Sequence, residues 1–89
     1  MNFEERREYR KIDFEIKCYI LDSDINQIIY DLENCDDAQI IKKHFERVQY
    51  LVETYRELAW SGIKLDISYD EGYMQSLAGL LFDKYCELI

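Results

Sequence analysis

The stretch "DSDINQIIYDLE", residues 22–33, decides whether the chain carries a calcium loop or a helix at this point. It places oxygen-bearing side chains at positions 1, 3, 5 and 12 of a twelve-residue window, as an EF-hand loop does. Such a loop also needs glycine at its sixth position for a sharp turn, and here that residue is Gln27. The apolar residues instead have the spacing of an amphipathic helix: Ile25, Ile28, Ile29 and Leu32. The stretch therefore predicts a helix over residues 24–34, capped by Asp22, Ser23 or Asp24, and no metal site.

The segment before this stretch fits two periodicities. The sequence "KIDFEIKCYIL", residues 11–21, alternates apolar and polar residues as a half-buried strand does. A helical stripe also runs through it, made of Tyr9, Ile12, Ile16 and Ile20. A second apolar set falls on the opposite face of such a helix, made of Phe14, Cys18 and Leu21. Because Asn2 and Glu5 resemble a capping box and no turn signal follows, we predict a helix over residues 3–20, with a strand over 12–20 as the alternative.

Two further helices are expected after residue 34. Residues 37–61 carry apolar side chains at alternating steps of four and three, after Asp36 or Asp37 as the cap and before Gly62 as the stop. The pair Ser68 and Glu71 resembles a capping box and predicts the start of a helix over residues 69–88. This helix is apolar on nearly every side. Between them, "IKLDIS", residues 63–68, predicts either a short strand or an extended connector whose apolar side chains cover the end of the bundle.

These elements predict one domain over residues 1–89 with an all-α fold. The expected architecture is a small four-helix bundle, with helices near residues 3–20, 24–34, 37–61 and 69–88. The alternative is an α+β fold with two short strands near residues 12–20 and 63–67. A chain of 89 residues buries a modest core, and its 48% hydrophobic content sets it apart from a disordered acidic tail.

The charge is strongly acidic, with a formal net charge of −8. Residues 18–41 contain six acidic residues and no lysine or arginine. This balance argues against direct binding to nucleic acid through a basic patch and against binding an anionic membrane. The three cysteines lack metal-like spacing, and the N-terminal sequence "MNFEERREYRK" has no apolar leader, so we expect a cytoplasmic location.

The sequence contains no recognisable catalytic constellation. His44 is the only histidine, and it stands nine residues after Cys35, which is not a helical ligand spacing. There is no glycine-rich phosphate loop, no H-E-x-x-H and no C-x-x-C. We therefore predict a non-enzymatic protein with no catalytic residues, no metal ligands and no cofactor.

The acidic stretch and the eight tyrosines favour binding to a protein target that has a basic surface. The candidate contact residues are Asp22, Asp24, Tyr30, Asp31, Glu33, Asp36 and Asp37. Not all of Tyr19, Tyr30, Tyr50, Trp60 and Tyr69 fit inside so small a core, so some should lie on a binding face.

The expected function is to bind and inhibit or neutralise that target. Carboxylates along helices can imitate the charges of a nucleic-acid backbone, so a nucleic-acid mimic is the sharpest form of this hypothesis. The excess of isoleucine and tyrosine over alanine, glycine and proline indicates an AT-rich genome, such as that of a low-GC bacterium or its phages. The alternative function is a structural homodimer, or a small subunit of a larger complex, that associates through the apolar helix 69–88.

Overall fold

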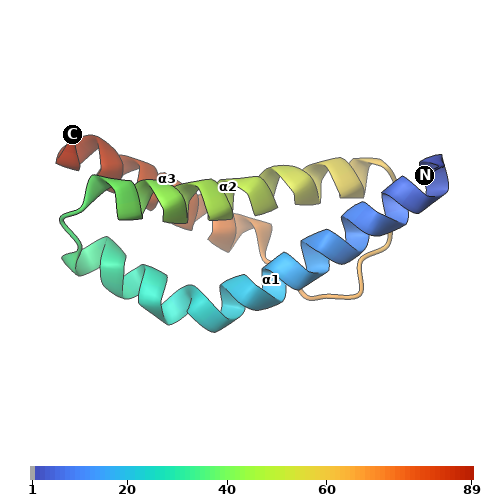
Figure 1. Ribbon diagram of the computed structural model, residues 1–89, viewed down its shortest axis with the longest axis horizontal. Helices are drawn as coiled ribbons and strands as arrows, with labels where there is room; N and C mark the ends of the chain where they lie inside the picture. Colours follow the sequence, from blue (N-terminus) through green and yellow to red (C-terminus); the bar gives the residue numbers. More distant parts are fainter. Residues whose placement is uncertain (1) are drawn as a thin grey trace.

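The computed structural model describes residues 2–89, which form three α-helices (Figure 1). Helix α1 spans Phe3–Asn34, α2 spans Ala38–Trp60 and α3 spans Glu71–Leu88. The molecule is elongated, 44 Å by 21 Å by 21 Å, with the C-terminus near the turn between α1 and α2 and the N-terminus at the other end (Figure 1). The all-α prediction is confirmed. The α+β alternative is wrong, because residues 2–89 contain no strand.

The predicted division into four helices is also wrong, because residues 3–20 and 24–34 belong to one continuous helix. A single apolar stripe passes through residues 22–24 at steps of four and three, made of Phe14, Cys18, Leu21, Ile25, Ile28 and Leu32. Aspartate and serine disfavour a helix interior only weakly, by a few tenths of a kcal/mol, roughly. Burial of the whole stripe outweighs that preference, and the helix continues.

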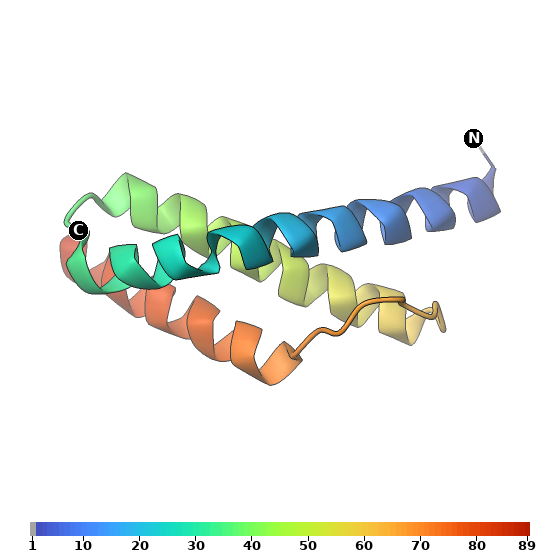
Figure 2. The same cartoon turned by 90° about the horizontal axis from the view of Figure 1, so that it is seen from below.

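Helix α1 changes direction near residues 20–25, where it curves relative to α2 (Figures 1 and 2). At this point the Ser23 hydroxyl donates a hydrogen bond to the carbonyl oxygen of Tyr19, over 3.1 Å. A serine that bonds back to the preceding turn competes with the helix ladder and bends helices. Ser23 was one of three candidate caps, but it acts as a helix-interior residue at the bend.

Side chains at the true helix starts fill the cap positions. Asn2 and Glu5 form the predicted capping box at the start of α1. Asp37 caps α2 by accepting a hydrogen bond from the backbone N–H of Gln39. At α3 the predicted Ser68 is not the cap; Asp70 takes that role and accepts from the backbone N–H of Tyr73.

The core lies between the three helices; α2 and α3 pack closely together, and α1 lies mainly against α2. Phe14 of α1 is fully buried, and its ring contacts the rings of Tyr55 and Tyr69. The segment between α2 and α3 is the extended connector, and its apolar side chains Ile63, Leu65 and Ile67 pack against the core. None of the helices described is long and apolar enough to cross a membrane.

Candidate partner-binding surface

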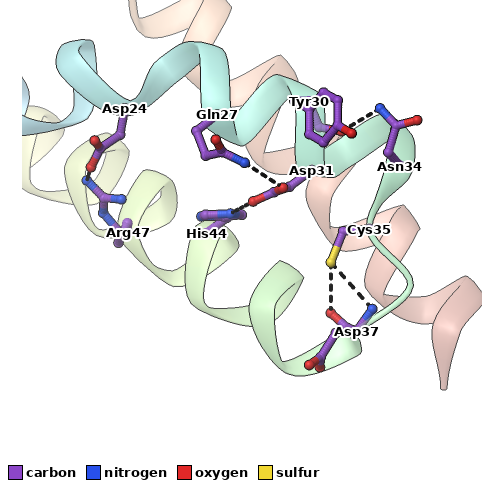
Figure 3. A network of polar contacts seen from close by, with 9 residues as sticks. All are labelled: Asp24, Gln27, Tyr30, Asp31, Asn34, Cys35, Asp37, His44 and Arg47. Carbon is purple, nitrogen blue, oxygen red and sulfur yellow. Dashed lines mark hydrogen bonds and ion pairs between the residues drawn. The ribbon is translucent and has the colours of Figure 1, made fainter.

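Two of the predicted contact residues are held by side chains of α2, Asp24 by an ion pair and Asp31 by a hydrogen bond. Asp24 accepts a hydrogen bond from the guanidinium of Arg47, with 3.1 Å between Oδ2 and Nη2 (Figure 3). Asp31 accepts one from His44, with 2.8 Å between Oδ2 and Nε2, and a second from the amide of Gln27 (Figure 3). These carboxylates therefore join α1 to α2, and their charges face basic groups of the same chain.

The Asp31–His44 pair lies largely out of solvent, with the two side chains 17% and 14% exposed. The hydrogen bond from His44 lowers the pKa of the Asp31 carboxyl, and the bond from Gln27 acts in the same direction, while partial burial opposes them. The other ring nitrogen of His44, Nδ1, is buried and has no hydrogen-bond partner. One carboxylate therefore orients the imidazole.

The other predicted residues have different environments. Asp37 is occupied as the cap of α2, and its backbone contacts the sulfur of Cys35 (Figure 3). Asp22, Glu33 and Asp36 are exposed and form no ion pair with any residue that the structure describes. Tyr30 is exposed as well, and its carbonyl oxygen accepts a hydrogen bond from Asn34.

The seven predicted residues do not share one surface. A helix turns by about 100° per residue, so Asp24 and Asp31 fall on the flank of α1 that faces α2. Asp22 and Glu33 fall on the opposite flank by the same geometry. Because the continuous helix spreads the EF-hand-like side chains around its axis, they cannot converge on one cation. Within residues 2–89 no group of three or more histidine, cysteine or acidic side chains could hold a metal ion.

The structure exposes one of the two apolar stripes that the sequence places on α1. Five apolar side chains lie on the face of α1 opposite its buried stripe, and we call them the outer stripe: Tyr9, Ile12, Ile16, Tyr19 and Ile20. Each is about half exposed or more; Ile16, for example, is 53% exposed. Large apolar side chains that stay exposed together over about three helical turns are typical of interaction sites.

The outer stripe has an acidic edge. Glu8, Glu15 and Asp22 follow one another at intervals of seven residues, so they line one side of it along α1. Glu15 also accepts a hydrogen bond from the backbone N–H of Asp66, which ties this edge to the connector. The opposite edge is mixed in charge, since Lys17 there is paired with Asp13.

Other exposed apolar side chains are more scattered. On α3, Tyr73 and Leu80 lie on one side and Phe82 on another, and each is about half exposed. Trp60, at the end of α2, is 92% exposed. The prediction that some of the aromatic residues lie on the surface is confirmed for Tyr19, Tyr30, Tyr50 and Trp60, whereas Tyr69 packs against the core.

Comparison with known proteins gives no match to a protein family, to a curated protein or to a solved structure. The signal that pointed to the outer stripe was present in the sequence, because one helix carried two apolar stripes and a small bundle buries only one. Which of the two lies outside became visible only in the folded molecule.

Proposed function

We propose that this protein is a non-enzymatic binding protein that attaches to a protein target and inhibits or neutralises it. The observation that carries the proposal is the outer stripe on α1, whose apolar side chains are each about half exposed or more. Two of its five members are tyrosines, a residue type that contributes strongly to protein interfaces because it is large, fairly rigid and has a polar tip.

The proposed target presents an apolar strip beside basic residues. The acidic edge formed by Glu8, Glu15 and Asp22 is complementary to such a surface, and the net charge of −8 accelerates the approach of a basic partner. Apolar contact would then hold the complex. An antiparallel pairing of two copies through this stripe would set one acidic edge against the other, which disfavours self-association there.

A nucleic-acid mimic is a narrower form of the same proposal. Support for it rests on Asp22, Glu33 and Asp36, which are exposed and free of ion pairs within residues 2–89. Asp24 and Asp31 add less, because Arg47 and His44 already donate hydrogen bonds to their carboxylates. We therefore favour an apolar interface with acidic steering. We further propose that the protein works in a reducing bacterial cytoplasm, encoded by a bacterium or a phage, consistent with its three free thiols.

A second candidate function is a homodimer or a small subunit that associates through α3. The exposed side chains Tyr73 and Leu80 on that helix favour it. The two candidates use different helices, so one pair of matched substitutions separates them. Ile16 on α1 and Leu80 on α3 are 53% and 54% exposed, and either can become aspartate without changing the core.

The experiment compares capture of proteins from a nuclease-treated bacterial lysate by the wild type, Ile16→Asp and Leu80→Asp, at low and high salt. We expect one target to be captured by the wild type and by Leu80→Asp and to be lost with Ile16→Asp. Capture should weaken at high salt, because salt screens the acidic steering. Loss with Leu80→Asp but not with Ile16→Asp, or a salt-resistant dimer that only Leu80→Asp disrupts, would contradict the proposal in favour of the second function.

A further inference from the structure

A groove of about 570 Å³ lies between α1 and α2. Its floor is made by Leu21 and Leu51, which are almost fully buried, and its walls include the half-exposed side chains of Ile20 and Tyr50. The α1 residues that line it lie just before the bend at Ser23. A volume of this size is typical of small-molecule sites, which are mainly apolar and carry a few polar groups that fix the ligand's orientation.

The rim of the groove is basic although the protein as a whole is acidic. Lys17, Lys43 and Arg47 line it together with one acid, Glu46. Lys17 is held by Asp13 and lies over the ring of Tyr50, with 4.4 Å between its nitrogen and the ring centre. Arg47 donates one hydrogen bond to Asp24 and keeps further N–H donors.

Lys43 is the distinctive group of this rim. It is exposed and forms no ion pair in the part of the chain that the structure describes. The acid that lines the rim, Glu46, is paired with Lys42, with 4.0 Å between Oε1 and Nζ. An apolar floor beside an ammonium group without a counter-ion matches a ligand that has one apolar part and one negative charge.

From this combination we propose that the groove binds a small amphipathic anion, with a single apolar chain on Leu21 and Leu51 and an anionic head beside Lys43 and Arg47. The site is independent of the proposed function, since it lies between α1 and α2 and shares only Ile20 with the outer stripe. The anionic head can be a carboxylate or a phosphate, and both are recognised by the same charges. A cationic amphiphile of the same length would place like charges together at the rim.

The test measures binding of decanoate to the full-length protein by calorimetry, below the concentration at which micelles form. Decyl phosphate tests whether the anionic head group can be a phosphate. Decyltrimethylammonium has the same apolar chain and a positively charged head group. We expect decanoate or decyl phosphate to bind, and the cationic compound to bind at least about tenfold more weakly. Backbone amide resonances should shift at Ile20, Leu21 and Leu51.

Two charge reversals provide the matched comparison, Lys43→Glu in the groove and Lys64→Glu on the connector. Both lysines are exposed, and neither forms an ion pair within residues 2–89. We expect Lys43→Glu to weaken binding about tenfold and Lys64→Glu to leave it within about twofold. Ile20→Trp, which fills the mouth of the groove without touching the core, should also weaken binding. Equal binding of anionic and cationic chains, equal effects of the two reversals, or resonance shifts elsewhere would overturn the proposal.

Discussion

Nε2 of His44 lies 2.8 Å from Oδ2 of Asp31, so a single polar pair fastens the last turn of α1 to α2. The hydrogen bond from His44 holds the pKa of Asp31 below its ordinary value of 3.8, helped by Gln27 and opposed by partial burial. A carboxyl group whose pKa is lowered by folding stabilises the native state while it is ionised. That contribution to stability is present in full at a pH above the ordinary pKa of 3.8. It is lost as the pH falls below 3.8 and through the lower pKa that Asp31 has in the native state.

Asp31→Asn should therefore make the protein less stable at neutral pH and less sensitive to acid. We expect the free energy of unfolding near pH 7 to fall by about 1 kcal/mol, because a partly buried hydrogen bond to a charged group is weakened. Urea unfolding between about pH 7 and about pH 3 measures both effects. Asp36→Asn is the control, because Asp36 is exposed and has no ion pair among the residues described. An acid dependence in Asp31→Asn as steep as that of the wild type would contradict this account.

Two neighbouring positions on α1 should respond very differently to truncation. Phe14 is fully buried between aromatic rings, so Phe14→Ala should destabilise the protein by about 3–5 kcal/mol. Ile16 points away from the core, so Ile16→Ala should change the stability by about 0.5 kcal/mol or less. Thermal or urea unfolding of both variants provides the measurement. A larger loss for Ile16→Ala would mean that α1 buries its other face.

The continuity of α1 can be tested at Ser23. Because Ser23 lies inside a helix, Ser23→Ala removes only a bond to the preceding turn and should leave stability unchanged or slightly increased. Asp70→Ala removes the cap of α3 and should cost about 1 kcal/mol. The comparison by urea unfolding is direct, since both positions carry polar side chains at the surface. A cap-sized loss for Ser23→Ala would restore the boundary between two helices that the sequence suggested.

The cysteines should differ in reactivity. Burial raises the pKa of the Cys18 thiol from 9.0 to about 12, and the carboxylates of Asp22 and Glu15 add to the effect. Cys86 is exposed on α3. Alkylation of the native protein near pH 8, followed by mass spectrometry, should modify Cys86 first and Cys18 only after unfolding in denaturant. Rapid modification of Cys18 in the native protein would show that α1 opens from α2 and α3.

Tyr69 offers a stabilising substitution. Its hydroxyl is buried without a hydrogen-bond partner, and burial raises the pKa of this group. Tyr69→Phe keeps the ring that packs against Phe14 and Tyr55, so stability should stay the same or rise by about 1 kcal/mol. Tyr50→Phe is the comparison, because the Tyr50 hydroxyl donates a hydrogen bond to Asp13 and its loss should not stabilise. A clear loss of stability in Tyr69→Phe would indicate that its hydroxyl has a partner in solution.

The sequence alone determined the elements whose local signals agree. The helix predicted over residues 37–61 is found at Ala38–Trp60, and the helix predicted over 69–88 is found at Glu71–Leu88. The signals for these helices are capping side chains, a glycine at the end of one helix and a regular apolar spacing. Each of them depends only on residues that are close together in the sequence. Such signals need no knowledge of the rest of the fold.

The candidate site was less accessible from the sequence. Asp24 and Asp31 were selected for their charge, but their hydrogen-bond partners Arg47 and His44 lie 23 and 13 residues away along the chain, on another helix. Local patterns do not reveal which charges meet across a helix pair. The sequence therefore overestimated how many acidic side chains are free of partners within the chain. It also did not show which apolar stripe of α1 is exposed.

Only the tertiary structure decided how α1 is used. Both of its apolar stripes have helical spacing, and its residues 22–24 carry cap-forming side chains that suggest a break. Helix α1 packs with Phe14 against Tyr55 and Tyr69, and the same face continues past Ser23 to Ile28. Long-range burial therefore chose one face and one continuous helix, because the free energy of packing a whole stripe exceeds the local preferences of a few residues.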